Sequence, residues 1–95
     1  MSATPDRSGQ VVVEFFGVAR ARAGVSECQV SGGRFREIIC ELSDRFPAWA
    51  EQCAEPDRLR RGYIANLNGQ RFLNDPDTLI QPGDHLLILS ADVGG

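Results

Sequence analysis

The two residues at the end of the sequence, Gly94 and Gly95, are the ones whose type and position could do chemistry. Glycine has no Cβ, so a glycine pair adopts nearly any backbone conformation and fits a slot too narrow for a side chain. A terminal α-carboxyl has a pKa of about 3.3–3.7, so it is ionised at neutral pH and can attack the α-phosphorus of ATP to form an acyl adenylate. We therefore interpret the Gly95 carboxylate as the reactive group. A chance glycine pair at a frayed terminus is the alternative.

The segment before this pair predicts a strand that leads directly into it. Leu86 to Leu89 is wholly apolar, as expected of a strand in the interior of a sheet. A second central strand is predicted from Val11 to Ala19, which is rich in β-branched and aromatic residues. The turn signal at Gly24 predicts an antiparallel hairpin between this strand and a shorter one at Glu27 to Val30.

A helix is predicted after Arg34, because the apolar residues there follow the spacing of one helical face. These residues are Phe35, Ile38, Ile39, Leu42 and Phe46. We expect Ser31 or Gly33 to cap this helix without a capping box, and Pro47 to end it. A short helical turn is expected from Ala48 to Cys53.

The second half of the sequence predicts a surface loop and then a hairpin. Proline, charge and glycine interrupt every period from Ala54 to Gly62, and the arginines there suit either a solvated loop or an acidic partner. Tyr63 to Leu67 and Gln70 to Leu73 are predicted strands joined by a turn at Asn68-Gly69. Two proline turns are expected around Leu79-Ile80.

The predicted element order is that of an α+β, ubiquitin-like β-grasp fold. In this fold a mixed sheet of four to five strands packs on one main helix, and the first and last strands lie side by side in parallel. We expect a disordered leader at residues 1–9, a single β-grasp domain at residues 10–91 and a flexible diglycine tail at residues 92–95.

Composition and charge exclude several classes of function. The net charge is −3 and no basic run is longer than Arg60-Arg61, which argues against a nucleic-acid partner. No segment is apolar enough to be a signal peptide or a membrane span, so we expect a cytoplasmic protein with no membrane partner. All 10 basic residues are arginine, so no lysine amine is present to capture an activated C-terminus.

The cysteines and the histidine give no pattern typical of a metal site, a disulfide framework or an enzyme active site. Cys28, Cys40 and Cys53 are widely spaced, with no C-x-x-C pair. We expect Cys40 to act as a small hydrophobe in its helix, and a redox or sulfur-relay role for Cys28 or Cys53 is the minor alternative. His85 is interpreted as a strand-edge residue without chemistry. The chain is therefore not expected to be an enzyme.

Several motifs together resemble the MoaD/ThiS group of ubiquitin-like sulfur carriers, above all the small subunit of molybdopterin synthase. The resemblance extends from Val11 to Gly95. It includes FFGVARARAG near the start, RFP at Arg45 to Pro47 and LNG at Leu67 to Gly69. It also includes the spaced Asp75, Leu79 and Gly83-Asp84, and the final diglycine.

The resemblance implies a carrier cycle in which partners supply the catalysis. An E1-like enzyme adenylates Gly95 with ATP, a sulfur donor enzyme's persulfide sulfur replaces AMP, and the thiocarboxylate gives its sulfur to a synthase subunit. That subunit would be the large subunit of molybdopterin synthase or an analogue. No cofactor is bound by the carrier itself. The tail residues Asp92 and Val93, and Ile64, Leu87 and Leu89 on the sheet face away from the helix, are the expected partner-binding residues.

The chain departs from the small-subunit pattern just before its tail. Ser90-Ala91 stands where two prolines are typical, and Asp92 stands where a small apolar residue is usual. The sulfur acceptor could therefore belong to thiamine, cysteine or secondary-metabolite synthesis. A β-grasp module that binds a partner noncovalently, and a protein modifier joined to lysines of other proteins, are further alternatives.

Overall fold

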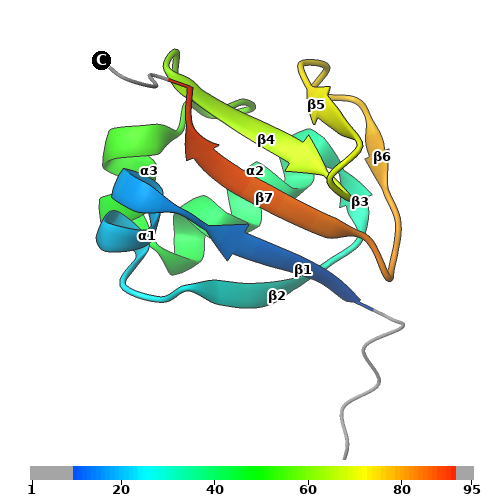
Figure 1. Ribbon diagram of the computed structural model, residues 1–95, viewed down its shortest axis with the longest axis horizontal. Helices are drawn as coiled ribbons and strands as arrows, with labels where there is room; N and C mark the ends of the chain where they lie inside the picture. Colours follow the sequence, from blue (N-terminus) through cyan, green and yellow to red (C-terminus); the bar gives the residue numbers. More distant parts are fainter. Residues whose placement is uncertain (1–9, 92–95) are drawn as a thin grey trace, which may run out of the picture.

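The computed structural model describes residues 10–91, and the predicted leader and diglycine tail lie outside these residues. The elements follow one another as shown in Figure 1: β1 (Gln10–Phe15), α1 (Gly17–Ala23), β2 (Glu27–Ser31), β3 (Gly33–Arg34), α2 (Phe35–Arg45), α3 (Pro47–Cys53), β4 (Tyr63–Leu67), β5 (Arg71–Leu73), β6 (Leu79–Ile80) and β7 (His85–Ser90).

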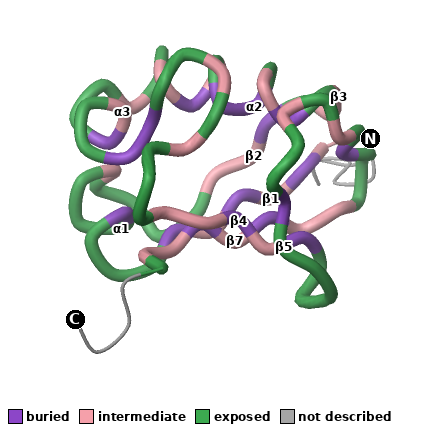
Figure 2. Tube along the Cα trace, turned by 90° about the horizontal axis from the view of Figure 1, so that it is seen from above, coloured by how far each residue is buried: buried purple, intermediate pink, exposed green. Residues whose placement is uncertain are grey.

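Five of the strands form one mixed sheet in the order β2-β1-β7-β4-β5. β1 and β7, the first and last strands, pair in parallel from Val12 opposite His85 to Phe15 opposite Ile88. The other pairings in this sheet are antiparallel. The predicted parallel pairing of the first and last strands is confirmed, and it places β7 in the middle of the sheet. In Figure 2, α2 and α3 lie on one side of this sheet.

The hydrophobic core lies between α2, α3 and the inner face of the sheet. Four residues of the predicted helical stripe, Phe35, Ile38, Ile39 and Leu42, are all buried, whereas the fifth, Phe46, is the half-buried residue after the end of α2. Each such side chain contributes roughly 1.5–3 kcal/mol when fully buried, so this stripe is a large part of the stability of a small domain. The end of β1 completes the core, since Phe15 makes an edge-to-face contact with Trp49, with ring centroids 5.9 Å apart.

The prediction of one long strand from Val11 to Ala19 is wrong. β1 ends at Phe15 and α1 begins at Gly17, where φ is +59°. The sequence GVARARA is rich in alanine and arginine, which favour helix, and the single buried residue of α1 is Ala19. α1 ends at Gly24, whose left-handed φ of 81° lets its N–H donate to the Arg20 carbonyl at 2.9 Å. β1 and β2 pair as predicted, but a helix connects them instead of a tight turn.

The start of α2 also differs from the prediction. Its N-cap is Arg34, whose backbone N–H donates to Glu37 Oε1 at 2.7 Å. Arginine has no acceptor to complete a capping box, so only the glutamate half of that motif forms. Gly33, a predicted cap, instead pairs with Ile80 in the two-stranded sheet of β3 and β6. The predicted main helix is thus the longest of three in residues 10–91, the predicted short turn is α3, and the proline-turn segment contains a short strand.

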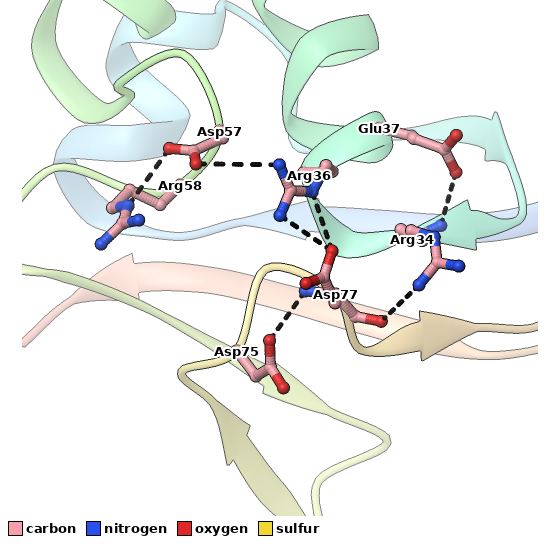
Figure 3. Close-up of polar contacts among 7 residues, drawn as sticks. All are labelled: Arg34, Arg36, Glu37, Asp57, Arg58, Asp75 and Asp77. Carbon is pink, nitrogen blue, oxygen red and sulfur yellow. Dashed lines mark hydrogen bonds and ion pairs between the residues drawn. The ribbon is translucent and has the colours of Figure 1, made fainter.

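The loop at residues 55–59 and the segment before β6 are both tied to the start of α2 by polar contacts (Figure 3). Arg36 donates to Asp77 Oδ1 through Nη2 at 2.8 Å and Nε at 3.0 Å. The same guanidinium lies 4.0 Å from Asp57, whose pKa is lowered mainly by a hydrogen bond from Arg58. Asp75 accepts from the backbone N–H of Asp77 at 2.9 Å. These groups are solvent-exposed, so they fix the loops more than they add stability.

The hairpin predicted at Asn68-Gly69 is confirmed. Both residues have positive φ, 58° and 70°, as a type I′ turn requires. Gln70 N–H closes the turn on the Leu67 carbonyl at 3.0 Å, and β5 returns alongside β4. This hairpin brings Asn68 beside His85 at the start of β7.

Candidate functional site

β7 is hydrogen-bonded on both sides as far as Ile88, and on the β4 side alone up to the last residue that the structure describes. It pairs with β1 on one side and with β4 on the other, where Ser90 lies opposite Tyr63. One residue later, the Ala91 N–H donates to the Gly62 carbonyl at 2.7 Å. The backbone is therefore fixed up to position 91. The predicted site residues Asp92, Val93, Gly94 and Gly95 lie outside the described residues.

The three predicted docking residues share one face of the sheet. Ile64 lies opposite Leu89 in the β4–β7 pair, and Leu87 lies opposite Asn66. Successive strand residues point to opposite faces, and the alternate residues Leu86 and Ile88 are buried in the core. Ile64, Leu87 and Leu89 therefore lie on the outer face, where they are half-buried. Their role in partner binding stays a prediction.

Two exposed aromatic rings extend this outer face. Phe72 in β5 lies opposite Asn66, and its side chain is 60% exposed. Phe16 follows β1 and is 42% exposed. We call the set the outer apolar face: Phe16, Ile64, Phe72, Leu87 and Leu89. A contiguous apolar surface of this kind is typical of a protein-binding site.

A polar pair that the sequence analysis missed lies within this face. His85 Nε2 is 2.9 Å from Glu14 Oε1, and the two side chains are 45% and 31% exposed. The backbone N–H of His85 donates to Asn68 Oδ1 at 2.7 Å, which fixes the start of β7. With Phe16 and Leu87 these residues line a shallow depression. His85 is therefore not an isolated strand-edge residue.

On the other side of Leu87 from this pair, Asn66 Oδ1 is buried with no hydrogen-bond partner among the described residues. An unpaired buried acceptor costs about 1–3 kcal/mol, so this atom lowers the stability of the sheet at that position. No local sequence pattern indicates either feature. The signal is the register of the sheet, which places β1 beside β7 and β7 beside β4.

The three cysteines have different surroundings, and one differs from its prediction. Cys40 was expected to pack as a small hydrophobe, but it lies on the exposed side of α2. Cys53 is buried, and burial raises its thiol pKa, partly opposed by a hydrogen bond with Tyr63. Burial likewise raises the pKa of Cys28, partly opposed by Arg45. A raised pKa leaves less thiolate at neutral pH, which disfavours a redox role for Cys28 and Cys53.

Neither a candidate metal site nor a helix that could span a membrane occurs in residues 10–91. In that part of the chain no cluster of three or more His, Cys, Asp or Glu side chains could hold a metal ion. No helix in it is long and apolar enough to cross a membrane.

Comparison with known proteins gives structural matches only. Neither the protein-family models nor the curated proteins match this sequence. The small archaeal modifier protein 1 of Methanosarcina acetivorans is 26% identical with a TM-score of 0.74, over 92% of this chain and 97% of that one. A putative molybdopterin converting factor, subunit 1, from Pyrococcus furiosus is 26% identical with a TM-score of 0.68, over 87% and 98%. The BexX/CysO complex of Amycolatopsis orientalis matches at 22% identity and a TM-score of 0.73, over 90% and 99%.

These matches cover nearly the whole length of each solved structure, so the predicted ubiquitin-like β-grasp fold is confirmed. The neighbours are small carrier and modifier proteins. One is described as a subunit, and another was solved as a complex.

Proposed function

From the premise that this chain is a MoaD/ThiS-like ubiquitin-fold protein, we propose that it is a sulfur carrier whose Gly95 carboxylate becomes a thiocarboxylate. The observation that carries the proposal is the position of β7. The central strand of the sheet is fixed on both sides as far as Ile88 and on the β4 side as far as Ala91, and the sequence then continues as Asp-Val-Gly-Gly. A rigid body thus leads into a segment that ends in two residues without side chains.

The proposed cycle has three steps, and partners supply the catalytic groups in each. The Gly95 carboxylate attacks the α-phosphorus of ATP on an E1-like enzyme, and pyrophosphate leaves. A persulfide on a sulfur donor enzyme attacks the acyl carbon and expels AMP. Reduction of the acyl disulfide by a thiol then leaves the thiocarboxylate. The carrier itself binds no cofactor in this proposal, and the reactions take place in the cytoplasm.

The outer apolar face is the proposed docking surface for the sulfur-accepting synthase subunit. Its centre, Leu87, lies between Asn66 and the Glu14–His85 pair. Buried apolar residues would supply most of the binding energy, and the polar pair would fix the orientation of the partner. In this proposal Asp92 and Val93 enter the partner together with the diglycine.

An intact mass measurement tests the chemistry directly. The protein isolated from its own host should contain a species with one sulfur in place of one oxygen, located at Gly95 by fragmentation. A chain lacking Gly94 and Gly95 should fold with unchanged stability and never acquire the sulfur. The carrier function is wrong if a cognate activating enzyme, ATP and a sulfur donor never convert the full-length chain.

We propose molybdopterin formation as the accepting pathway. The proposal is supported by the 26% identity to a putative molybdopterin converting factor subunit and by the RFP sequence at the end of α2. The thiocarboxylated chain should convert a cyclic pterin precursor when mixed with the large synthase subunit of its host. If it transfers sulfur only to thiamine, cysteine or secondary-metabolite enzymes, the carrier chemistry stands and the pathway is replaced.

A protein modifier is the second candidate, favoured by the equal identity to the small archaeal modifier protein. The chain has no lysine, so it could be attached to other proteins through Gly95 but could not accept a second copy on a lysine. Adducts on host proteins that disappear when Gly94 and Gly95 are deleted would support this function. Single, unbranched additions are expected.

A further inference from the structure

Three arginines lie close to the point where the described chain leaves β7. Arg22 Nη2 is 3.9 Å from Glu51 Oε1, and Arg60 Nη2 donates to the backbone carbonyl of the same Glu51 at 3.1 Å. Arg61 follows directly, and the next residue, Gly62, accepts the Ala91 N–H. We call Arg22, Arg60 and Arg61 the arginine collar. Figure 1 shows α1, α3 and the end of β7 at the same end of the molecule.

Within residues 10–91, the charge of the collar is largely uncompensated. Among these residues Glu51 is the acidic side chain in contact with it, and that carboxylate is 81% exposed and at the limit of ion-pair distance from Arg22. Arg61 is exposed and makes no hydrogen bond or ion pair with the rest of the described chain. The carboxylate of Asp57, in the neighbouring loop, instead accepts a hydrogen bond from Arg58 Nε at 3.2 Å. A positive surface therefore occurs in a protein whose net charge is −3.

We propose that the arginine collar docks an acidic surface of the activating enzyme and thereby guides the end of the chain to its adenylation site. This inference rests on the proposed function. A carrier with a net negative charge is repelled by an acidic partner in most orientations. The collar attracts the partner only in the orientation in which residue 91 faces it. Such steering acts mainly on the association rate and weakens with salt.

The positions of the three arginines favour a ligand with several carboxylates on a protein surface over a ligand with a single phosphate group. Arg22 is on α1, whereas Arg60 and Arg61 are in the loop before β4, so the guanidinium groups are spread over two elements. The contacts that do form hold Arg60 on the α3 backbone and not around a common point. A phosphate site usually adds backbone N–H groups that converge on the anion.

Charge reversal tests the proposal in an adenylation assay with the E1-like enzyme of the host. Arg61→Glu and Arg22→Glu should each lower kcat/KM about tenfold at low salt, with kcat nearly unchanged. The effect should shrink as salt is added. Arg71→Glu is the matched control, because it changes net charge equally but lies in β5, away from the collar. Thermal melts confirm that each variant is folded.

The outcomes separate the collar from the carrier function. If the wild-type chain is adenylated and the collar variants behave like Arg71→Glu, the collar proposal is wrong and the carrier function stands. If the wild-type chain is never adenylated, both fail.

An NMR titration with a glutamate-rich peptide tests the surface without any enzyme. Amide shifts should concentrate at residues 20–23 and 60–62, persist in a chain lacking residues 92–95, and vanish in the Arg22→Glu, Arg61→Glu double variant. Shifts spread equally over Arg34, Arg36 and Arg71 would overturn the proposal. So would pyrophosphate binding at the collar more tightly than the peptide, because the site would then be for phosphate.

Discussion

At the scale of single residues, the three thiols are expected to react in a fixed order. Cys40 is exposed, whereas Cys28 is half-buried and Cys53 is buried, and burial raises the thiol pKa of both of these. At a pH below the thiol pKa, a raised pKa means a smaller thiolate fraction. Alkylation of Cys28 and Cys53 is therefore slowed both by their burial and by their smaller thiolate fraction. Iodoacetamide at pH 7.5, followed by peptide mass spectrometry, should label Cys40 first by at least about tenfold.

The same order predicts a pH dependence. Labelling of Cys28 and Cys53 should continue to accelerate above the ordinary thiol pKa, because their folded-state pKa values lie higher. Cys40→Ser should leave a chain that reacts slowly until it is unfolded. Fast reaction of Cys53 in the folded Cys40→Ser chain would contradict its burial.

Trp49 carries a second prediction at this scale. Its indole is fully buried against Phe15, yet Nε1 has no hydrogen-bond partner within residues 10–91. Trp49→Ala should lower the free energy of unfolding by about 3–5 kcal/mol through the cavity it leaves. Trp49→Phe should cost far less, about 1–2 kcal/mol, because it keeps an aromatic ring and removes the unpaired donor. Urea denaturation measures both, and equal losses would show that the donor is satisfied in solution.

At the scale of elements, sequence periodicity predicted the helix that buries a regular stripe of apolar residues. It failed for elements that bury few residues. α2 was found because four of its residues are buried at helical spacing. α1 was missed because it buries only Ala19, so its sequence carries no amphipathic stripe, and Phe16 continues the apolar run of β1 while its ring is exposed. β3 and β6 have two residues each, which is too short for any period.

The end of α1 should depend on Gly24. This residue has φ of 81°, and no atom lies within 4 Å of where a Cβ would be, so only backbone strain opposes a side chain there. Gly24→Ala should therefore cost about 1 kcal/mol, whereas Gly24→Asn should cost about half as much, because asparagine tolerates the left-handed region. Thermal unfolding of the two variants decides the matter. An equal loss in both would instead indicate a steric clash.

At the scale of the whole molecule, the sequence could indicate which residues of one strand share a face. It could not indicate which residues of different strands lie side by side, because that depends on strand pairing. The two-residue repeat of a strand placed Ile64, Leu87 and Leu89 on one face, and the structure places them on the outer face, whereas their role in partner binding stays a prediction. The Glu14–His85 contact joins residues 71 positions apart and arises only from the parallel register of β1 and β7. The arginine collar likewise combines α1 with the loop before β4.

The outer apolar face and the arginine collar should therefore be separable by mutation. Leu87→Lys places a charge at the centre of the outer apolar face, where Glu14 on the neighbouring strand can pair with it and preserve the fold. It should weaken binding of the sulfur-accepting subunit at least about tenfold, or roughly 1.4 kcal/mol, and leave adenylation unchanged.

Leu79→Lys is the control, since Leu79 is 60% exposed on β6, outside this face. Calorimetric titration of the accepting subunit with each variant provides the comparison. Equal affinities would mean that the subunit binds elsewhere, and a parallel loss of adenylation would mean that both partners use the same face.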